Sequence, residues 1–135
     1  MYPFDMEAEK FLLSTEDFCA DASVTEGEAL SASALARGWK VYRLDARRMT
    51  DKKALLDHLA AELAFPAYFG GNWDAVMDCL TDFDGKSLVL VADCALLEKS
   101  DPALLADFRD VMDSAGRSLH EFRKGAAGLK TIFLR

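Results

Sequence analysis

Residues 72–92 read NWDAVMDCLTDFDGKSLVLVA and contain two different hydrophobic periods. Asn72 can cap a helix, and the apolar residues of Trp73–Phe83 recur at the spacing of one helical face. Asp84-Gly85 is a typical turn pair, and Ser87–Ala92 is a continuous apolar run. Such a run is expected of a strand that is buried on both faces, as in a parallel sheet. The stretch therefore predicts a helix, a turn and a buried strand.

The flanking sequence supplies further strands and helices in alternation. Trp39–Leu44 alternates between apolar and polar residues and predicts a strand. A helix capped by Thr50 follows and ends before Phe65-Pro66. Asp101-Pro102 begins another helix, and Leu129–Leu134 is a terminal strand. Strands separated by helices imply right-handed crossovers, so we expect an α/β fold with a small parallel sheet of roughly three to four strands flanked by helices.

The N-terminal part of the chain gives weaker signals. We expect residues 1–38 to form an extension packed on or beside a domain of residues 39–135. Within this extension, weak patterns predict a short strand over Phe11–Leu13, a loop over Ala20–Gly27 and a helix over Glu28–Arg37. Near the other end of the chain, a similarly weak pattern predicts a short helix over Ser118–Phe122.

The helix predicted over Trp73–Phe83 has two chemically different sides. At 100° per residue, a narrow apolar stripe for the core is formed by Val76, Cys79, Leu80 and Phe83. Asp74, Asp78 and Thr81 lie on the opposite side, and Asp82 follows Asp78 by one helical turn. Like charges at this spacing destabilise a helix by roughly a few tenths of a kcal/mol per pair. A helix selected only for stability would carry Lys or Arg there.

Two interpretations of this acidic side remain open. A solvated helix face is the simpler one. A binding surface is favoured because large side chains border the carboxylates: Tyr68, Phe69, Trp73 and Met77. Aromatic residues beside charges are typical of interface hot spots.

The charge distribution narrows the choice of partner. The net charge is −7, and Ala54–Gly85 contains six carboxylates and no Lys or Arg. Such a surface repels nucleic acid and attracts a basic protein. We therefore expect no nucleic-acid partner.

Other sequence features concern the compartment. No apolar run approaches the roughly 20 residues of a membrane span, and the acidic N-terminus has no secretory h-region. The three cysteines are odd in number and form no C-x-x-C pair, so reduced thiols are expected. We expect a cytoplasmic protein without membrane contact.

Candidates for catalysis or metal binding have simpler explanations. His58 and Glu62 are one helical turn apart, and His120 precedes Glu121, but a surface histidine beside a carboxylate is the commoner case. Cys79 lies on the core stripe, which favours an inert thiol. The aspartates of the acidic side lie in a row rather than around a point, unlike calcium ligands. We expect no enzyme activity, no metal and no cofactor.

Residues 65–83, FPAYFGGNWDAVMDCLTDF, resemble the barstar family of intracellular ribonuclease inhibitors. The shared pattern Tyr-x-Gly-x-Asn-x-Asp-Ala-x-x-Asp-Cys-Leu-Thr begins at Tyr68, and weaker similarity extends from about Trp39 to Arg135. The resemblance implies a parallel sheet with surrounding helices and a monomeric, non-catalytic inhibitor. Its partner would be a basic, extracellular-type ribonuclease, barnase-like or other, whose active site the acidic helix blocks. The carboxylates would take the place of substrate phosphates.

Carried over by position, the resemblance implies partner contacts at Tyr68, Asn72, Trp73, Asp74, Met77, Asp78, Thr81 and Phe83 and, on a later helix, Asp110. Asp78 matches the carboxylate on which the family relies most. Several positions differ from barstar: Met77 and Phe83 replace tryptophans, Gly71 a glutamate, Trp73 a leucine and Asp82 a glycine. These differences concern the identity of the partner rather than the fold. The alternative is a regulatory module that binds a basic protein other than a nuclease through the same face.

Overall fold

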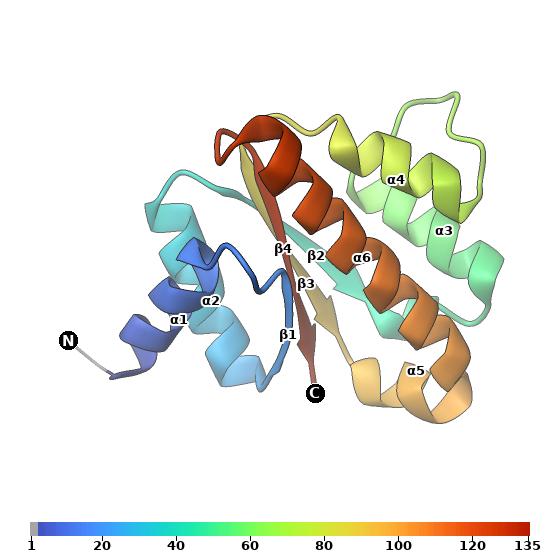
Figure 1. The fold of residues 1–135 in the computed structure, drawn as a ribbon. Helices are drawn as coiled ribbons and strands as arrows, with labels where there is room; N and C mark the ends of the chain where they lie inside the picture. The colour runs from blue at the N-terminus through green and yellow to red at the C-terminus, as the bar shows by residue number, and fades with distance from the viewer. Residues whose placement is uncertain (1–2) are drawn as a thin grey trace.

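The computed structural model describes residues 3–135, and within them one sheet of four parallel strands lies between two layers of helices (Figure 1). The strand order is β1-β4-β3-β2, and each neighbouring pair is parallel. The strands are β1 (Cys19–Ala22), β2 (Lys40–Asp45), β3 (Lys86–Ala92) and β4 (Gly128–Leu134). The predicted α/β fold class is confirmed.

Helices cover both faces of this sheet. One face carries α1 (Pro3–Leu13) and α2 (Val24–Ala36). The opposite face carries a short 3-10 helix and four α-helices: η1 (Ala46–Arg48), α3 (Lys52–Glu62), α4 (Trp73–Thr81), α5 (Cys94–Ser100) and α6 (Pro102–Arg123). None of the helices in residues 3–135 combines the length and the apolar character that crossing a membrane requires.

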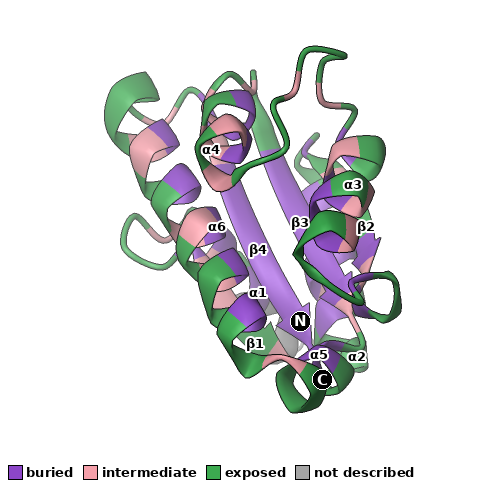
Figure 2. Cartoon of the chain, turned by 90° about the vertical axis from the view of Figure 1, so that its right-hand side faces the viewer, coloured by how far each residue is buried: buried purple, intermediate pink, exposed green. Residues whose placement is uncertain are grey.

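The predicted burial of β3 on both faces is confirmed. Val89 and Val91 belong to the core under α3–α6, whereas Leu88 and Leu90 belong to the core under α1 and α2. Each of these side chains is at most 1% exposed. Figure 2 shows the buried central strands between helices whose outer sides are exposed.

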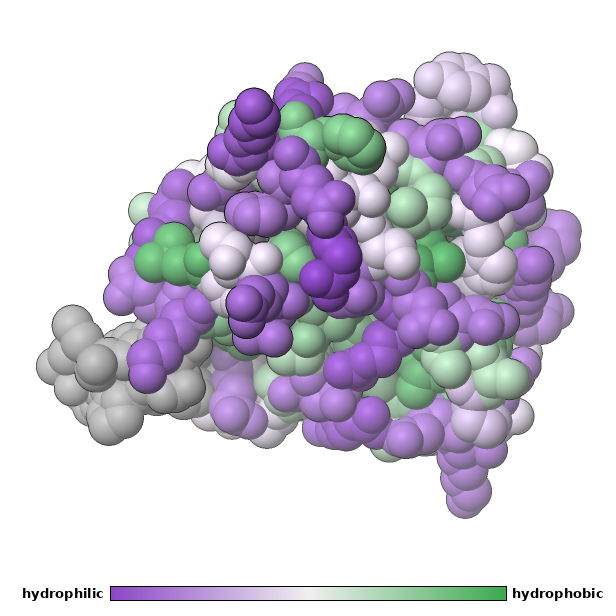
Figure 3. Space-filling model, in the orientation of Figure 1, coloured by the Kyte–Doolittle hydropathy of each residue, from purple (hydrophilic) through white to green (hydrophobic). Residues whose placement is uncertain are grey.

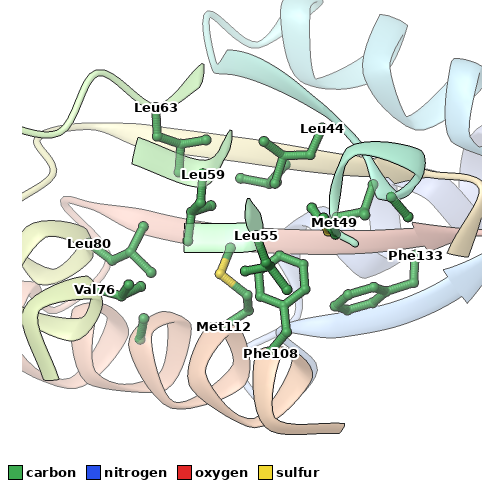
Figure 4. Close-up of a cluster of buried hydrophobic side chains, with 14 of the residues drawn as sticks. Leu44, Met49, Leu55, Leu59, Leu63, Val76, Leu80, Phe108, Met112 and Phe133 are labelled. Atoms are coloured by element: carbon green, nitrogen blue, oxygen red, sulfur yellow. The ribbon is translucent and has the colours of Figure 1, made fainter. Parts of the chain in front are cut away.

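Figure 4 shows part of the larger core, on the α3–α6 side of the sheet. Leu55 of α3, Val76 and Leu80 of α4 and Met112 of α6 converge there over the central strands. This packing fixes the rotation of α4 about its axis, because its apolar stripe must face the sheet.

The structure corrects the N-terminal predictions. Phe11–Leu13 is the end of α1 and not a strand, and the predicted loop Ala20–Gly27 contains the end of β1 and the start of α2. Ser23 and Glu26 form a capping box, so α2 begins earlier than the predicted helix Glu28–Arg37. The capping-box signal was present in the sequence, but the short β1 exists because its backbone pairs with β4.

Further boundaries change in the rest of the chain. α3 is capped by Asp51 rather than Thr50, because the Asp51 carboxylate accepts the N–H of Ala54 at 2.8 Å. α5 was not predicted. Ser118–Phe122 is no separate piece but the end of the continuous α6, in which Leu119 prolongs the buried stripe.

The described part of residues 1–38 shares a sheet and a core with the rest of the chain. β1 is an edge strand beside β4, and Arg37 of the α2 C-terminus forms an ion pair with Glu9 of α1. Leu12 and Leu30 from the two helices pack with Trp39 in the smaller core. The division into an extension and a domain beginning at residue 39 stays a prediction.

Lys130 of β4 joins the N-terminal segment to the sheet. This residue is only 4% exposed, and its ammonium donates to the carbonyl oxygen of Ser14 at 2.7 Å and to that of Asp17. It also lies 5.0 and 4.7 Å from the ring centroids of Phe11 and Phe18. Burial lowers the pKa of Lys130 to about 8, although the nearby Asp17 charge opposes this shift.

The burial of the Lys130 ammonium should make the stability of the protein depend on pH. Between the folded pKa of about 8 and the ordinary pKa of 10.5, the unfolded chain binds more protons than the folded chain. Stability contributed by Lys130 therefore rises with pH in that window. We expect the free energy of unfolding of the wild type, measured relative to that of Lys130→Met, to rise by roughly 1 kcal/mol between about pH 7 and about pH 9.

Urea denaturation under reducing conditions measures this difference. Burial also raises the pKa of Cys19 and of Cys94 to about 12, which lowers stability above their ordinary pKa of 9.0. Both proteins carry these thiols, so their contribution cancels in the comparison. Parallel pH profiles for the wild type and Lys130→Met would contradict the prediction.

Candidate functional site

The start and the buried face of α4 agree with the sequence-based prediction. The side-chain oxygen of Asn72 accepts the N–H of Ala75 at 2.8 Å, which confirms the predicted N-cap. Val76 and Leu80 are fully buried, and Cys79 is 9% exposed. These contacts leave the opposite side of α4 in solvent.

Unpaired carboxylates occupy that outer side. Asp74 and Asp78 are exposed, and so is Asp82 at the C-terminus of α4. Within residues 3–135 none of these three forms an ion pair. Some carboxylates on neighbouring elements do have partners, such as Asp57 of α3, which pairs with Lys53 at 2.6 Å. The outer side of α4 therefore carries uncompensated negative charge.

The neighbouring helix α6 carries further exposed carboxylates. α4 and α6 lie side by side (Figures 1 and 2), and the ring of Trp73 stacks on that of Phe108 at 6.4 Å between centroids. Asp107 and Asp110 of α6 are exposed and have no ion pair within the described chain. The resemblance named Asp110 as a contact and did not name Asp107, which lies one helical turn earlier.

The loop before α4 presents an exposed tyrosine. The rings of Phe65 and Phe69 pack at 5.2 Å between centroids, and both side chains contact the larger core. The N–H of Phe69 donates to the carbonyl of Pro66 at 2.9 Å and closes a turn. Tyr68 lies in this turn and is 82% exposed. The two phenylalanines thus anchor the loop and leave Tyr68 in solvent.

The residues carried over from the resemblance fall into two groups in the structure. The exposed group consists of Tyr68, Asn72, Asp74, Asp78 and Asp110. The partly buried group consists of Trp73, Met77, Thr81 and Phe83. The exposed group presents charged and hydrogen-bonding atoms to solvent. The partly buried group forms the surface from which the exposed side chains project.

Contacts within the protein hold the partly buried group in place. Phe83 lies beyond the last residue of α4, and its ring packs 6.0 Å from that of Tyr42. The hydroxyl of Thr81 donates to the carbonyl of Met77 at 2.8 Å. Trp73, as described above, stacks on α6.

The site is bordered by a lysine, Lys52, that sequence reasoning did not identify. The ammonium of Lys52, at the start of α3, lies 5.8 Å from the ring centroid of Trp73. In the sequence Lys52 precedes the cation-free stretch and belongs to another helix. Its place beside Trp73 follows only from the packing of α3 and α4 in one layer.

The molecular surface exposes few large hydrophobic side chains among the described residues. Figure 3 shows a mostly hydrophilic face, on which hydrophobic side chains form small separate groups. Among the described residues, the exposed large hydrophobic side chains are Leu13, Val24, Leu35, Tyr68, Leu96 and Phe122. Of these, Tyr68 belongs to the candidate site. Tyr68 is thus the only strongly exposed large hydrophobic side chain among the described residues of the candidate site.

The candidates for catalysis have structural roles. His58 of α3 accepts the backbone N–H of Asp45 at 2.9 Å, and this hydrogen bond ties α3 to the end of β2. Burial, followed by the charges of Asp78 and Asp82, raises the pKa of Cys79, so its thiolate is disfavoured. Within residues 3–135 no group of three or more His, Cys, Asp or Glu side chains is arranged to hold a metal ion.

Loss of the N-cap should weaken α4 specifically. We expect Asn72→Ala to lower the free energy of unfolding by about 1 kcal/mol, because the N–H of Ala75 loses its acceptor. Asn72→Ser is the matched control, since serine caps about as well and should change stability little. Urea denaturation measures both variants, and equal stability of Asn72→Ala and Asn72→Ser would refute the role of the cap.

A protein family model matches most of the chain. A search of curated proteins found no match to the chain. The family model described as Barstar (barnase inhibitor) matches residues 39–128, from the residue before β2 to the first residue of β4. The match contains α4, the loop before it and Asp110, and it excludes α1, β1 and α2. Because the model covers more than half of the sequence, the chain belongs to the barstar family.

Proposed function

We propose that this protein is an inhibitor of a basic ribonuclease and that it blocks the nuclease active site with the outer side of α4. The observation that carries the proposal is the uncompensated charge of Asp74 and Asp78. Family membership supports the class of partner. The inhibitor acts as a monomer in the cytoplasm, where a nuclease must be held inactive before export.

The chemistry of the acidic surface fits a nuclease cleft. An enzyme that binds the RNA backbone presents cationic side chains where phosphates lie. Asp74 and Asp78 on α4, with Asp107 and Asp110 on α6, offer carboxylate oxygens to those cations. Charge-assisted hydrogen bonds of this kind are the strong ones, and bidentate pairing with arginine adds geometric specificity. Asp78 is the principal contact in this proposal.

The aromatic residues have separate tasks in the proposed complex. Tyr68 is the exposed aromatic anchor, because its loop is already fixed by Phe65 and Phe69 and little order is lost on binding. Trp73 and Phe83 are held against Phe108 and Tyr42, so they form a firm base rather than protruding anchors. The surface offered to a partner is therefore expected to be flatter than a binding surface from which indole rings protrude.

Truncation of Asp78 tests the proposed contact. We expect Asp78→Ala to weaken binding to the cognate nuclease by about 3 kcal/mol, roughly a hundredfold, because a cation of the nuclease is left buried without its partner. Barnase and a panel of basic secreted ribonucleases are the probes, with inhibition of RNA cleavage and the dissociation rate as readouts.

Glu16→Ala is the matched control for net charge. Glu16 is exposed on the loop after α1, remote from α4, and its truncation removes the same single charge. It should leave the dissociation rate unchanged. Equal affinity of the wild type and Asp78→Ala would sink the proposed contact. Binding of a basic protein without inhibition of any ribonuclease would favour the regulatory module instead.

Association should be steered by charge. The net charge of −7 and the unpaired carboxylates of α4 attract a basic partner over a distance that salt screens. We expect the association rate to fall at least roughly tenfold between about 20 mM and about 500 mM salt. Stopped-flow fluorescence measures this rate, and a rate independent of salt would contradict steering.

A further inference from the structure

A small cavity lies where the N-terminal segment meets the rest of the protein. Its volume is about 170 Å³. Its walls come from the end of α1 and the loop after it, the residue before β2, the starts of β3 and β4, and the end of α6 with the loop that follows. The apolar part of the wall includes Leu12, Phe18, Trp39 and Leu129. An apolar cavity of about 150 Å³ is large enough for benzene, so this cavity can take a single ring or a short aliphatic chain.

The ionisable side chains among the described residues that line the cavity are all basic. Lys86, His120 and Lys130 contribute to its wall, and no carboxylate does so among the residues described there. In a chain of net charge −7, a wall with three basic groups and no acidic one runs against the overall composition. The cavity is therefore a local positive site in an acidic protein.

Neither Lys86 nor Lys130 forms an ion pair within the described chain, although the Asp17 charge acts on Lys130. Lys86 is exposed, and its ammonium lies 5.8 Å from the ring centroid of Trp39. Lys130 is 4% exposed and donates to the carbonyl oxygens of Ser14 and Asp17, which are neutral acceptors. The lowered pKa of Lys130 agrees with a buried positive charge that is not fully compensated. His120 lies with its ring centroid 5.9 Å from that of Phe18.

We propose that this cavity binds a small organic monocarboxylate, whose apolar body enters between Phe18, Trp39 and Leu129 and whose carboxylate faces Lys86 and Lys130. Apolar walls with a few convergent polar groups are typical of small-molecule sites. Residues 12–15 and Phe18 form part of the wall, so the site depends on the segment that the family model does not match. The site is separate from the acidic surface of α4.

The test uses the full chain and benzoate as the probe. Isothermal titration calorimetry gives the affinity, and two-dimensional NMR of backbone amides locates the site. Chemical-shift changes should cluster at residues 12–18 and 125–130, with none on α4. Shifts scattered over the surface, or no binding at millimolar benzoate, would overturn the proposal.

Matched ligands separate charge from apolar contact. Benzamide has the same ring and no charge, and sulfate has the charge and no ring. We expect benzoate to bind and neither of the other two to displace it at equal concentration. Equal binding of benzamide would show that the basic groups do not recognise a carboxylate, and equal competition by sulfate would show that the ring is not recognised.

Matched variants test the role of the lysine. Lys86 is exposed, so Lys86→Met should fold normally while removing one cation from the cavity mouth. We expect its affinity for benzoate to be at least roughly fivefold weaker than that of the wild type. Lys99→Met is the control, because Lys99 is an exposed lysine of α5 outside the cavity wall. Equal affinities of Lys86→Met and Lys99→Met would refute the assignment.

Discussion

Burial of β3 and β4 on both faces is the constraint on which the rest of the structure depends. Leu88 and Leu90 of β3 pack with α1 and α2, while Val89 and Val91 pack with the layer from α3 to α6. β4 behaves alike, with Ile132 in one core and Phe133 in the other. A strand with two apolar faces must be covered on both, since exposure of either would place a contiguous hydrophobic surface in water. The two helical layers provide this cover, one on each face of the sheet.

The second layer explains why the N-terminal segment is built into the fold. The part of the chain that matches the barstar family supplies the helices of only one layer, and α1 and α2 supply the other. Close packing then joins the two parts. A Cβ at Gly116 of α6 would lie 2.6 Å from the carbonyl oxygen of Leu129 and 2.9 Å from Cβ of Phe18. Glycine at this position therefore lets α6, β4 and the N-terminal segment approach one another.

The acidic surface is a consequence of how little of α4 the core needs. Val76, Cys79 and Leu80 hold the helix to the sheet, and the remaining positions are available for binding. Asp74 and Asp78 repel one another in the isolated protein, which is a small cost to stability that a cationic partner would remove. Sites that break a local rule of stability in this way are expected to be functional.

Much of the fold was determined by local sequence patterns. The continuous apolar run Ser87–Ala92 predicted a strand buried on both faces, and the Asp101-Pro102 pair predicted the start of α6, because these signals act within a few residues. The amphipathic pattern of Trp73–Phe83 likewise predicted which side of α4 faces the core. The family was predicted separately, from the resemblance of the motif that begins at Tyr68. These features depend on hydrophobic period and capping chemistry, which a sequence displays directly.

Other features were decided only by tertiary structure. β1 spans only Cys19–Ala22 and exists because β4 offers it a backbone partner, so no local pattern could identify it. Lys52 lies beside Trp73 only through the packing of separate helices into one layer. No local pattern around Lys130 indicates that its side chain is buried. Its burial depends on Phe11 and Phe18, which are more than a hundred residues away along the chain. Contacts between distant segments leave no local period or spacing, and for that physical reason the sequence alone could not reveal them.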